Sequence, residues 1–146
     1  MASQADISAE RLPPHNGPWY HGSAERLEVL KTGGSASPIL EIAAAFSHRP
    51  PEVGFETRHC GDVYSVIVRH SGKLPGYLYR VRVDDPARDL RPHPKAGQPI
   101  GWEMLTTRPL ALEFVRELPL AEEYRGSYSL PGLVRNDDDD EDGCGH

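Results

Sequence analysis

Residues that interrupt regular structure are spread along almost the whole chain, and they limit the folds it can adopt. Of its 146 residues, 14 are glycines and 14 are prolines, well above ordinary usage. So many interruptions favour a strand-based domain with frequent turns over a helical bundle. We therefore expect one α+β domain, mostly strands with one or two short helices, that buries its own core without disulfides or metals.

The clearest helix signal covers residues Pro38 to His48. Ser37 stands at the cap position, a proline follows at the first helical position, and Glu41 lies in the first turn. Four apolar residues have the spacing of one helix face: Ile39, Ile42, Ala43 and Phe46. A shorter helix is expected from Ala24 to Leu30, with Ser23 as its cap.

Four segments carry strand patterns, either β-branched runs or alternating polarity. They are Asp62–Val68, Tyr77–Val83, Ile100–Thr107 and Leu110–Leu118. In the second, alternation sets Tyr77, Tyr79, Val81 and Val83 on one face and Leu78, Arg80 and Arg82 on the other. The intervening segments are expected to be loops or irregular: Arg49–Gly61, Ala87–Pro99 and Pro119–Leu133.

Charge divides the chain into three parts. Residues 1–18 are expected to be a flexible N-terminal arm, 19–133 a folded domain and 134–146 an acidic disordered tail. Setting aside the six acids of Asp137–Asp142 leaves 16 acids against 16 Lys and Arg, so the body of the protein is near neutral. A near-neutral body argues against duplex nucleic acid as the main partner.

Targeting and metal signals are weak throughout. No segment has the length and apolarity of a membrane span or the pattern of a signal peptide, which predicts a cytoplasmic protein with no membrane partner. The two cysteines, Cys60 and Cys144, lie far apart and are expected to be free thiols. The histidines show no ligand spacing, so no metal site is expected.

The first candidate site is the stretch Trp19-Tyr20-His21-Gly22-Ser23. A short aromatic strand ends there in an imidazole, a glycine that lets a backbone approach closely, and a hydroxyl. The alternative for this stretch is a capped turn from a strand to a helix, in which the histidine only satisfies backbone groups.

The order of the motifs resembles the ADP-ribosyltransferase-like superfamily. Tyr-His-Gly-Ser is followed by Ala36-Ser37-Pro38 before an alanine-rich helix, then by Gly76-Tyr77-Leu78-Tyr79, and then by Glu103 shortly before Arg108-Pro109-Leu110. Small bacterial members, including the rifampin ADP-ribosyltransferases, share the Tyr/Phe-His-Gly-Thr/Ser opening and a Gly-Tyr-Ile/Leu-Tyr strand. The resemblance covers residues 19 to 118 and implies a split pair of antiparallel sheets that clasp NAD.

The resemblance also implies roles for particular residues. His21 would hydrogen-bond the ribose next to nicotinamide, the main chain of Gly22 would bind the carboxamide, and Ser23 would stand beside them. Glu103 matches the acidic residue that stabilises the oxocarbenium-like ribose when the nicotinamide bond breaks. The cofactor is then NAD, used as a substrate.

The chain departs from the family where an aromatic residue usually stacks on nicotinamide. Gly33-Gly34-Ser35 stands there instead, so the stacking ring would come from elsewhere. The candidate rings are Tyr64, Tyr77 and Tyr79. The reserve acids are Asp84 and Asp85. Arg80 and Arg82 are either contacts for a pyrophosphate or solvated cross-strand partners.

The function expected on these grounds is cleavage of the nicotinamide–ribose bond of NAD and transfer of ADP-ribose to an acceptor, a small molecule or a protein. Two alternatives stay open within the same fold. One is tRNA 2'-phosphotransferase-like chemistry, in which NAD accepts a phosphate. The other is a catalytically silent module that binds a nucleotide or a protein, which the missing aromatic residue favours.

Overall fold

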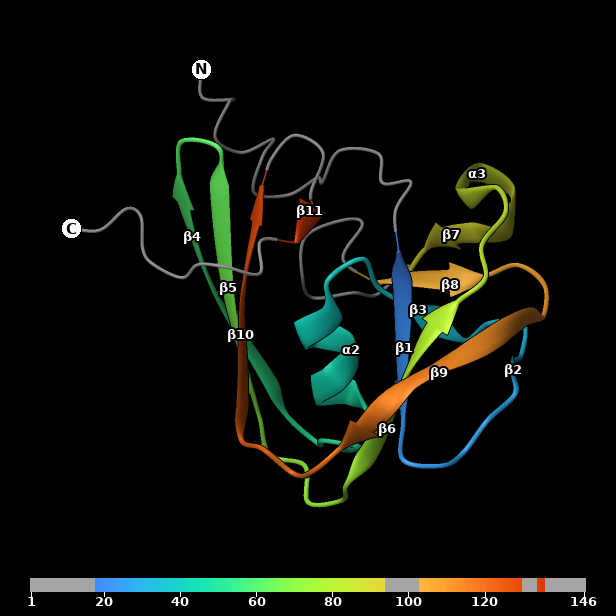
Figure 1. The fold of residues 1–146 in the computed structure, drawn as a ribbon, viewed down its shortest axis with the longest axis horizontal. Helices are drawn as coiled ribbons and strands as arrows, with labels where there is room; N and C mark the ends of the chain where they lie inside the picture. Colours follow the sequence, from blue (N-terminus) through green and yellow to red (C-terminus); the bar gives the residue numbers. More distant parts are fainter. Residues whose placement is uncertain (1–17, 94–102, 130–133, 136–146) are drawn as a thin grey trace.

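The computed structural model describes residues 18–93, 103–129 and 134–135 (Figure 1). In this part of the chain the strands form antiparallel sheets, and two short helices accompany them. The coarse expectation of a strand-rich α+β domain is therefore confirmed. The expected arm up to residue 17, and the tail from residue 136 with Cys144, lie outside the described residues. No helix in the described ranges is long and apolar enough to cross a membrane.

The first sheet has the order β1-β6-β9-β2. Its strands are β1 (Trp19–Ser23), β6 (Gly76–Val81), β9 (Leu110–Leu118) and β2 (Val29–Leu30). The sequence predicted β6 and β9 closely. Both faces of β6 are covered, because Leu78 packs near the helix while the hydroxyl of Tyr79 accepts the Leu27 N–H at 2.8 Å on the other face.

The expected helix from Ala24 to Leu30 does not form. The chain runs as a loop to Glu28 and then pairs with β9, with Leu30 opposite Leu110. The Ser23 hydroxyl does accept a backbone N–H, that of Glu25 at 2.9 Å, but it closes a turn. Strand pairing and the Tyr79 hydroxyl take the backbone groups that a helix would have used, so tertiary contacts override a weak local signal.

The second sheet has the order β11-β10-β5-β4. Its strands are β11 (Val134–Arg135), β10 (Glu123–Ser129), β5 (Val63–His70) and β4 (Val53–Cys60). Two expectations were wrong here, because β4 occupies the predicted loop and β10 the predicted irregular segment. β5 is buried at Tyr64, Val66 and Val68 and needs a partner on each side. The pairing with β11 continues past the expected domain boundary at residue 133.

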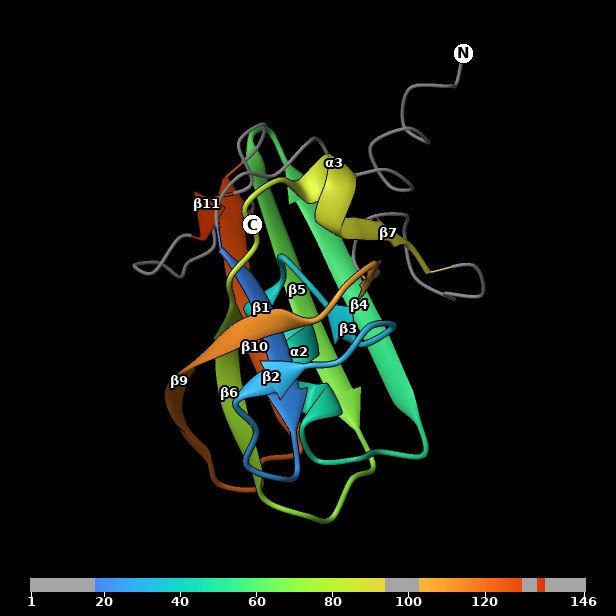
Figure 2. The same cartoon turned by 90° about the vertical axis from the view of Figure 1, so that its right-hand side faces the viewer.

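Helix α2 (Leu40–Phe46) lies between these two sheets (Figure 1), and its contacts reach β1 and β6 on one side and β5 and β10 on the other. It is shorter than the predicted Pro38–His48, because the chain is extended at Ile39 and turns after Phe46. Figure 2 shows the first sheet in front of the helix, with β4 and β5 behind it.

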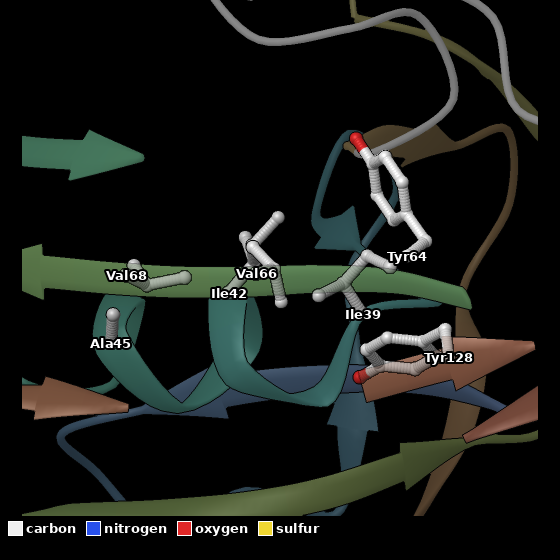
Figure 3. Packing of buried hydrophobic residues seen from close by; sticks show 7 residues of the cluster. All are labelled: Ile39, Ile42, Ala45, Tyr64, Val66, Val68 and Tyr128. Carbon is white, nitrogen blue, oxygen red and sulfur yellow. The ribbon is translucent and has the colours of Figure 1, made fainter. Parts of the chain in front are cut away.

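The predicted apolar stripe is confirmed for Ile39 and Ile42, whereas Ala43 packs in another cluster with Leu78 of the first sheet and Phe46 is only partly buried. Ile39 and Ile42 pack against the inner face of the second sheet (Figure 3), in one cluster made of Ile39, Ile42, Ala45, Tyr64, Val66, Val68 and Tyr128. Every member of this cluster is at most 1% exposed. The Ser37 hydroxyl accepts the Ile39 N–H at 3.0 Å, so it braces the turn into the helix.

A third, three-stranded sheet has the order β3-β8-β7. It consists of β3 (Ser35–Ala36), β8 (Met104–Thr106) and β7 (Leu90–Pro92). Of the strand predicted at Ile100–Thr107, the part before Glu103 lies outside the described residues. The predicted crossing from Ala87 contains the end of helix α3 (Pro86–Asp89) and then β7, while residues 94–99 are not described.

Candidate functional site

A small cleft opens where β1, β3, α2 and the residue before β8 meet. His21 and Gly22 come from β1, Ser35 from β3, Phe46 from α2, and Glu103 stands one residue before β8. Three of the residues that the sequence selected, His21, Gly22 and Glu103, therefore line the same cleft. Its empty volume is about 170 Å³, including solvent at the mouth.

The strand β3 brings the two halves of this cleft together. Tyr20 of β1 exchanges two backbone hydrogen bonds with Ser37, at 2.8 and 2.9 Å. On its other side β3 pairs with β8, with Ala36 opposite Met104. Because Ser37 and Glu103 are the next residues in that register, the carboxylate lies beside the edge of β1. A two-residue strand thus joins segments more than 80 positions apart in the sequence.

His21 is held in one tautomer. Its Nδ1 lies 2.7 Å from the carbonyl oxygen of Ser35, and because a carbonyl only accepts, Nδ1 carries the proton. In the neutral ring Nε2 is then an acceptor. Burial lowers the pKa of His21 below its usual value of 6.5, and the hydrogen bond to Ser35 offsets only part of that shift. The imidazole is therefore neutral at pH 7.

Gly22 has a steric reason to be glycine. A Cβ built there would lie 1.9 Å from the backbone oxygen of Ala43 and 2.9 Å from Cβ of Ser47. The strand thus runs directly against the backbone of α2, and only a residue without a side chain permits that approach. This requirement exists whether or not a ligand binds, so the motif glycine alone is not evidence of a binding site.

The main chain of Gly22 nevertheless faces the cleft side of β1. His21 stands opposite Tyr79 of β6, while Tyr20 turns its N–H and C=O the other way, toward Ser37. Backbone groups of alternate residues in a strand point the same way, so those of Gly22 share the direction of Tyr20. Within the part of the chain that the structure describes, this edge of β1 pairs at Tyr20 alone.

Glu103 is more sheltered than a surface carboxylate. Its side chain is 15% exposed, and Oε2 lies 4.0 Å from Nε2 of His93. The His93 backbone N–H also donates to the Glu103 carbonyl at 3.4 Å. A carboxylate held in this way can place negative charge in the cleft and orient a hydroxyl group there.

The tyrosines proposed as stacking rings lie elsewhere. Tyr64 belongs to β5 and is 1% exposed, because its side chain lies in the core on the inner face of the second sheet. Burial there raises the pKa of Tyr64 to about 12. Tyr77 and Tyr79 pack against Phe114, with centroid distances of 6.4 and 5.9 Å. None of the three is among the residues that line the cleft.

The aromatic rings along the cleft are instead those of Tyr20 and Phe46. Sequence reasoning assigned Phe46 only to the core-facing stripe of the helix and Tyr20 only to the opening motif. Both are partly exposed and partly packed, Phe46 against the core cluster of Figure 3. The signal that could have found Tyr20 is its place next to His21. Phe46 carries no comparable signal.

The remaining candidate residues lie outside the cleft and either make contacts within the fold or face solvent. The Ser23 hydroxyl accepts the Glu25 N–H, and the Asp85 carboxylate caps α3 by accepting the Ala87 N–H at 3.1 Å. Asp84 lies 3.6 Å from Arg108. The two arginines of this region, Arg80 and Arg82, are exposed on the first sheet. None of these groups lines the cleft.

In the described ranges no group of three or more His, Cys, Asp or Glu side chains is arranged to hold a metal ion. No family model matches the chain, and comparisons with curated proteins and with solved structures gave no match. The geometry of the cleft is therefore the basis for any functional assignment.

Proposed function

We propose that this chain is an ADP-ribosyltransferase-like protein that cleaves the nicotinamide–ribose bond of NAD and passes ADP-ribose to an acceptor. One observation carries the proposal: a neutral imidazole with an acceptor nitrogen, a strand edge without side chain, and a sheltered carboxylate line one cleft. The paired antiparallel sheets with a helix between them agree in outline with the fold that the resemblance implies.

The three groups suit three parts of the substrate. Nε2 of His21 can accept a hydrogen bond from a ribose hydroxyl, because Nδ1 keeps the ring proton. The N–H and C=O of Gly22 can pair with a primary carboxamide, which also carries one donor and one acceptor side. Glu103 can stabilise the positive charge that develops on the ribose as nicotinamide leaves.

Tyr20 and Phe46 can take the place of the missing stacking residue. They line the same cleft as the motif residues, whereas the tyrosines considered from the sequence do not. An aromatic side chain beside a nicotinamide ring contributes about 0.5–1.5 kcal/mol beyond the area that it buries. The acceptor of ADP-ribose stays unassigned, and water serves as the acceptor in the simplest assay.

The decisive experiment measures nicotinamide released from NAD by four proteins: the wild type, His21→Asn, Glu103→Gln and a control, Glu113→Gln. Asparagine can keep the donation to Ser35 while it removes the acceptor at Nε2. We expect a loss of about tenfold for His21→Asn and about a hundredfold for Glu103→Gln, because the latter removes a charge from the reacting centre. Glu113 is exposed on β9, so its variant is expected to match the wild type.

A silent binding module is the second candidate, and Gly33-Gly34-Ser35 in place of the usual aromatic residue favours it. Thermal stabilisation by NAD without release of nicotinamide would support this module. If NAD is neither cleaved nor stabilising, both the enzyme and a module that binds NAD are excluded.

A further inference from the structure

Three aromatic rings stack on one another at the end of α2. The ring centroids of His48 and His70 are 4.9 Å apart with an interplanar angle of 15°, and those of His48 and Tyr124 are 5.8 Å apart at 7°. His48 follows α2 and is fully buried, His70 ends β5, and Tyr124 lies at the start of β10. The stack therefore ties the helix to two neighbouring strands of the second sheet.

Every nitrogen of the two imidazoles has a hydrogen-bond partner. Nδ1 of His48 donates to the carbonyl of Leu74 at 2.6 Å, and Nε2 lies 2.5 Å from the Tyr124 hydroxyl, which can donate to it. Nε2 of His70 donates to the carbonyl of Ala121 at 2.5 Å, and Nδ1 accepts from the Gly72 N–H at 3.0 Å. The backbone N–H requires a neutral ring at His70, and burial favours the neutral ring at His48.

A proton added to either ring breaks this arrangement. On His70 it would have to enter at Nδ1, where it meets the Gly72 N–H. On His48 it would enter at Nε2 and displace the hydroxyl proton of Tyr124. Two imidazolium rings at 4.9 Å would also repel each other. Each uptake of a proton therefore costs hydrogen bonding, and the second also adds repulsion between like charges.

The groups that face the stack do not offset this cost. They are His70 from β5, Tyr124 from β10 and, near Tyr124, Arg116 from β9. Burial, the largest effect, lowers the pKa of His48, and His70 lowers it further, while the Leu74 carbonyl raises it. Among the described residues, no carboxylate forms an ion pair with either imidazole.

The carbonyls of Leu74 and Ala121 belong to two loops that cross between the sheets. One leads from β5 in the second sheet to β6 in the first, and the other returns from β9 to β10 (Figure 1). Both imidazoles thus hold the chain at the point where it passes from one sheet to the other. Phe46, which lines the cleft, lies two residues before His48.

We propose that the stack of His48, His70 and Tyr124 is an acid-sensitive joint, which fixes α2 and the two crossing loops while both imidazoles are neutral and loosens when they take up protons. The joint stands independently of NAD chemistry, since it rests on groups outside the cleft. If the chain does act on NAD, loosening the joint would displace Phe46 and reduce activity in mild acid.

The sign of the pH effect follows from linkage. Because the folded protein holds His48 neutral, the unfolded chain binds more protons once the pH falls below about 6.5, the usual value for histidine. The contribution of His48 is complete above that pH and falls below it, by up to about tenfold in the folding equilibrium constant per pH unit. The loss ends once the pH falls below the pKa that His48 has in the folded protein.

The test combines urea unfolding at pH 7.5 and 5.5 with NMR titration of the histidine rings. His48→Asn can keep the donation to Leu74, and His70→Gln can keep the donation to Ala121, without a group that titrates. We expect the folding equilibrium constant of the double variant to fall about tenfold less between the two pH values than that of the wild type, which is the amount that linkage gives for His48. Gly54→Ala is the control, because it changes a residue of the second sheet where an added Cβ has no atom within 4 Å and removes no titrating group.

Amide hydrogen exchange locates the loosening. After correction for intrinsic rates, protection at pH 5.5 should fall in α2 and the crossing loops more than in the centre of the first sheet. The NMR titration of the wild type decides the question even where a variant does not fold. Titration of His48 near pH 6.5 in the folded protein, or an unchanged pH slope in the double variant, would overturn the proposal.

Discussion

The Nδ1 of His21 donates to the carbonyl of Ser35 across 2.7 Å, from β1 to β3. This one contact leaves Nε2 as the acceptor nitrogen of the imidazole, and it links the opening motif to β3, the strand that pairs with β8 directly after Glu103. The orientation of the histidine is therefore set by backbone geometry, independently of any side chain that could titrate with it.

The pH dependence of the site should follow the neutral state of His21. If the cleft binds NAD as proposed, the lowered pKa of His21 predicts an affinity that is constant from pH 8 to about 6.5 and weakens only in more acidic solution. The same group contributes stability that is complete above about 6.5 and is lost as the pH falls. Binding measured by calorimetry between pH 5 and 8 checks this profile. A rise in affinity toward acid pH would contradict the assigned tautomer.

Gly22→Ala should destabilise the protein strongly. The added methyl group would lie 1.9 Å from the backbone oxygen of Ala43. Because that atom belongs to the backbone of α2, no side-chain movement can relieve the clash. We expect a loss of about 3 kcal/mol or more in the free energy of unfolding, the upper range for overpacking. Gly54→Ala is the matched control, since a Cβ there has no atom within 4 Å. Chemical denaturation compares the two.

The variant Phe46→Leu should distinguish the effect of the aromatic ring on affinity for NAD from the effect of its apolar volume on stability. Leucine keeps apolar packing against the core, so stability should change by less than about 1.5 kcal/mol. If the ring lies against nicotinamide, affinity for NAD should fall about fivefold, the equivalent of about 1 kcal/mol for an aromatic contact. Phe55→Leu, at a partly buried ring of β4, should leave that affinity unchanged. Equal losses in both variants would show a general packing effect.

Asp89→Asn should unfold the region around α3. The carboxylate is fully buried and accepts from Arg88 at 2.8 Å and Arg108 at 2.9 Å, and these guanidinium groups hold its pKa far below the usual value. It also accepts the N–H groups of Asp84 and Asp85. Removing its charge should lower the free energy of unfolding by less than the loss of a fully buried ion pair does, because both guanidinium groups are about half exposed.

Acid removes the contribution of Asp89 just as it removes that of the histidines, but in a lower pH range. Because the pKa of Asp89 is lowered on folding, its contribution is complete above the unfolded value of 3.8 and disappears only below it. Unfolding curves of the wild type and Asp89→Asn should therefore converge as the pH falls below about 4. Curves that stay parallel would assign the effect of the variant to packing.

The sequence predicted those elements whose local pattern agrees with their tertiary surroundings. The stripe of Ile39 and Ile42, and the β-branched run of β5, are buried as expected. β4 was missed because its edge position leaves most of its described side chains exposed and its apolar face has only Val53 and Phe55. The Gly61-Asp62 pair, with Gly61 at φ 61°, is the hairpin signal that could have found it.

The candidate site was predicted in part for a physical reason. His21 and Gly22 stand in one motif, and Glu103 follows from the order of motifs, so a one-dimensional pattern can select them. The cleft itself depends on β3, a strand of two residues that pairs with segments on either side of it. No periodicity exists in two residues, so neither the role of Ser35 nor the approach of Phe46 could be predicted from sequence.

Helix α2 is pressed from both sides by glycines, but the two contacts differ in kind. At Gly22 the opposing atom is a peptide oxygen of the helix, whereas at Gly126 of β10 it is the carboxylate of Glu41, which also accepts a hydrogen bond from the Tyr128 hydroxyl. A larger residue at position 126 can in principle be rescued by a shorter one at position 41. No second-site change of side chain can do the same for position 22. The two glycine positions therefore differ in how they can evolve. The contact at Gly126 can be replaced by paired substitutions at positions 126 and 41, whereas the contact at Gly22 cannot be replaced in this way.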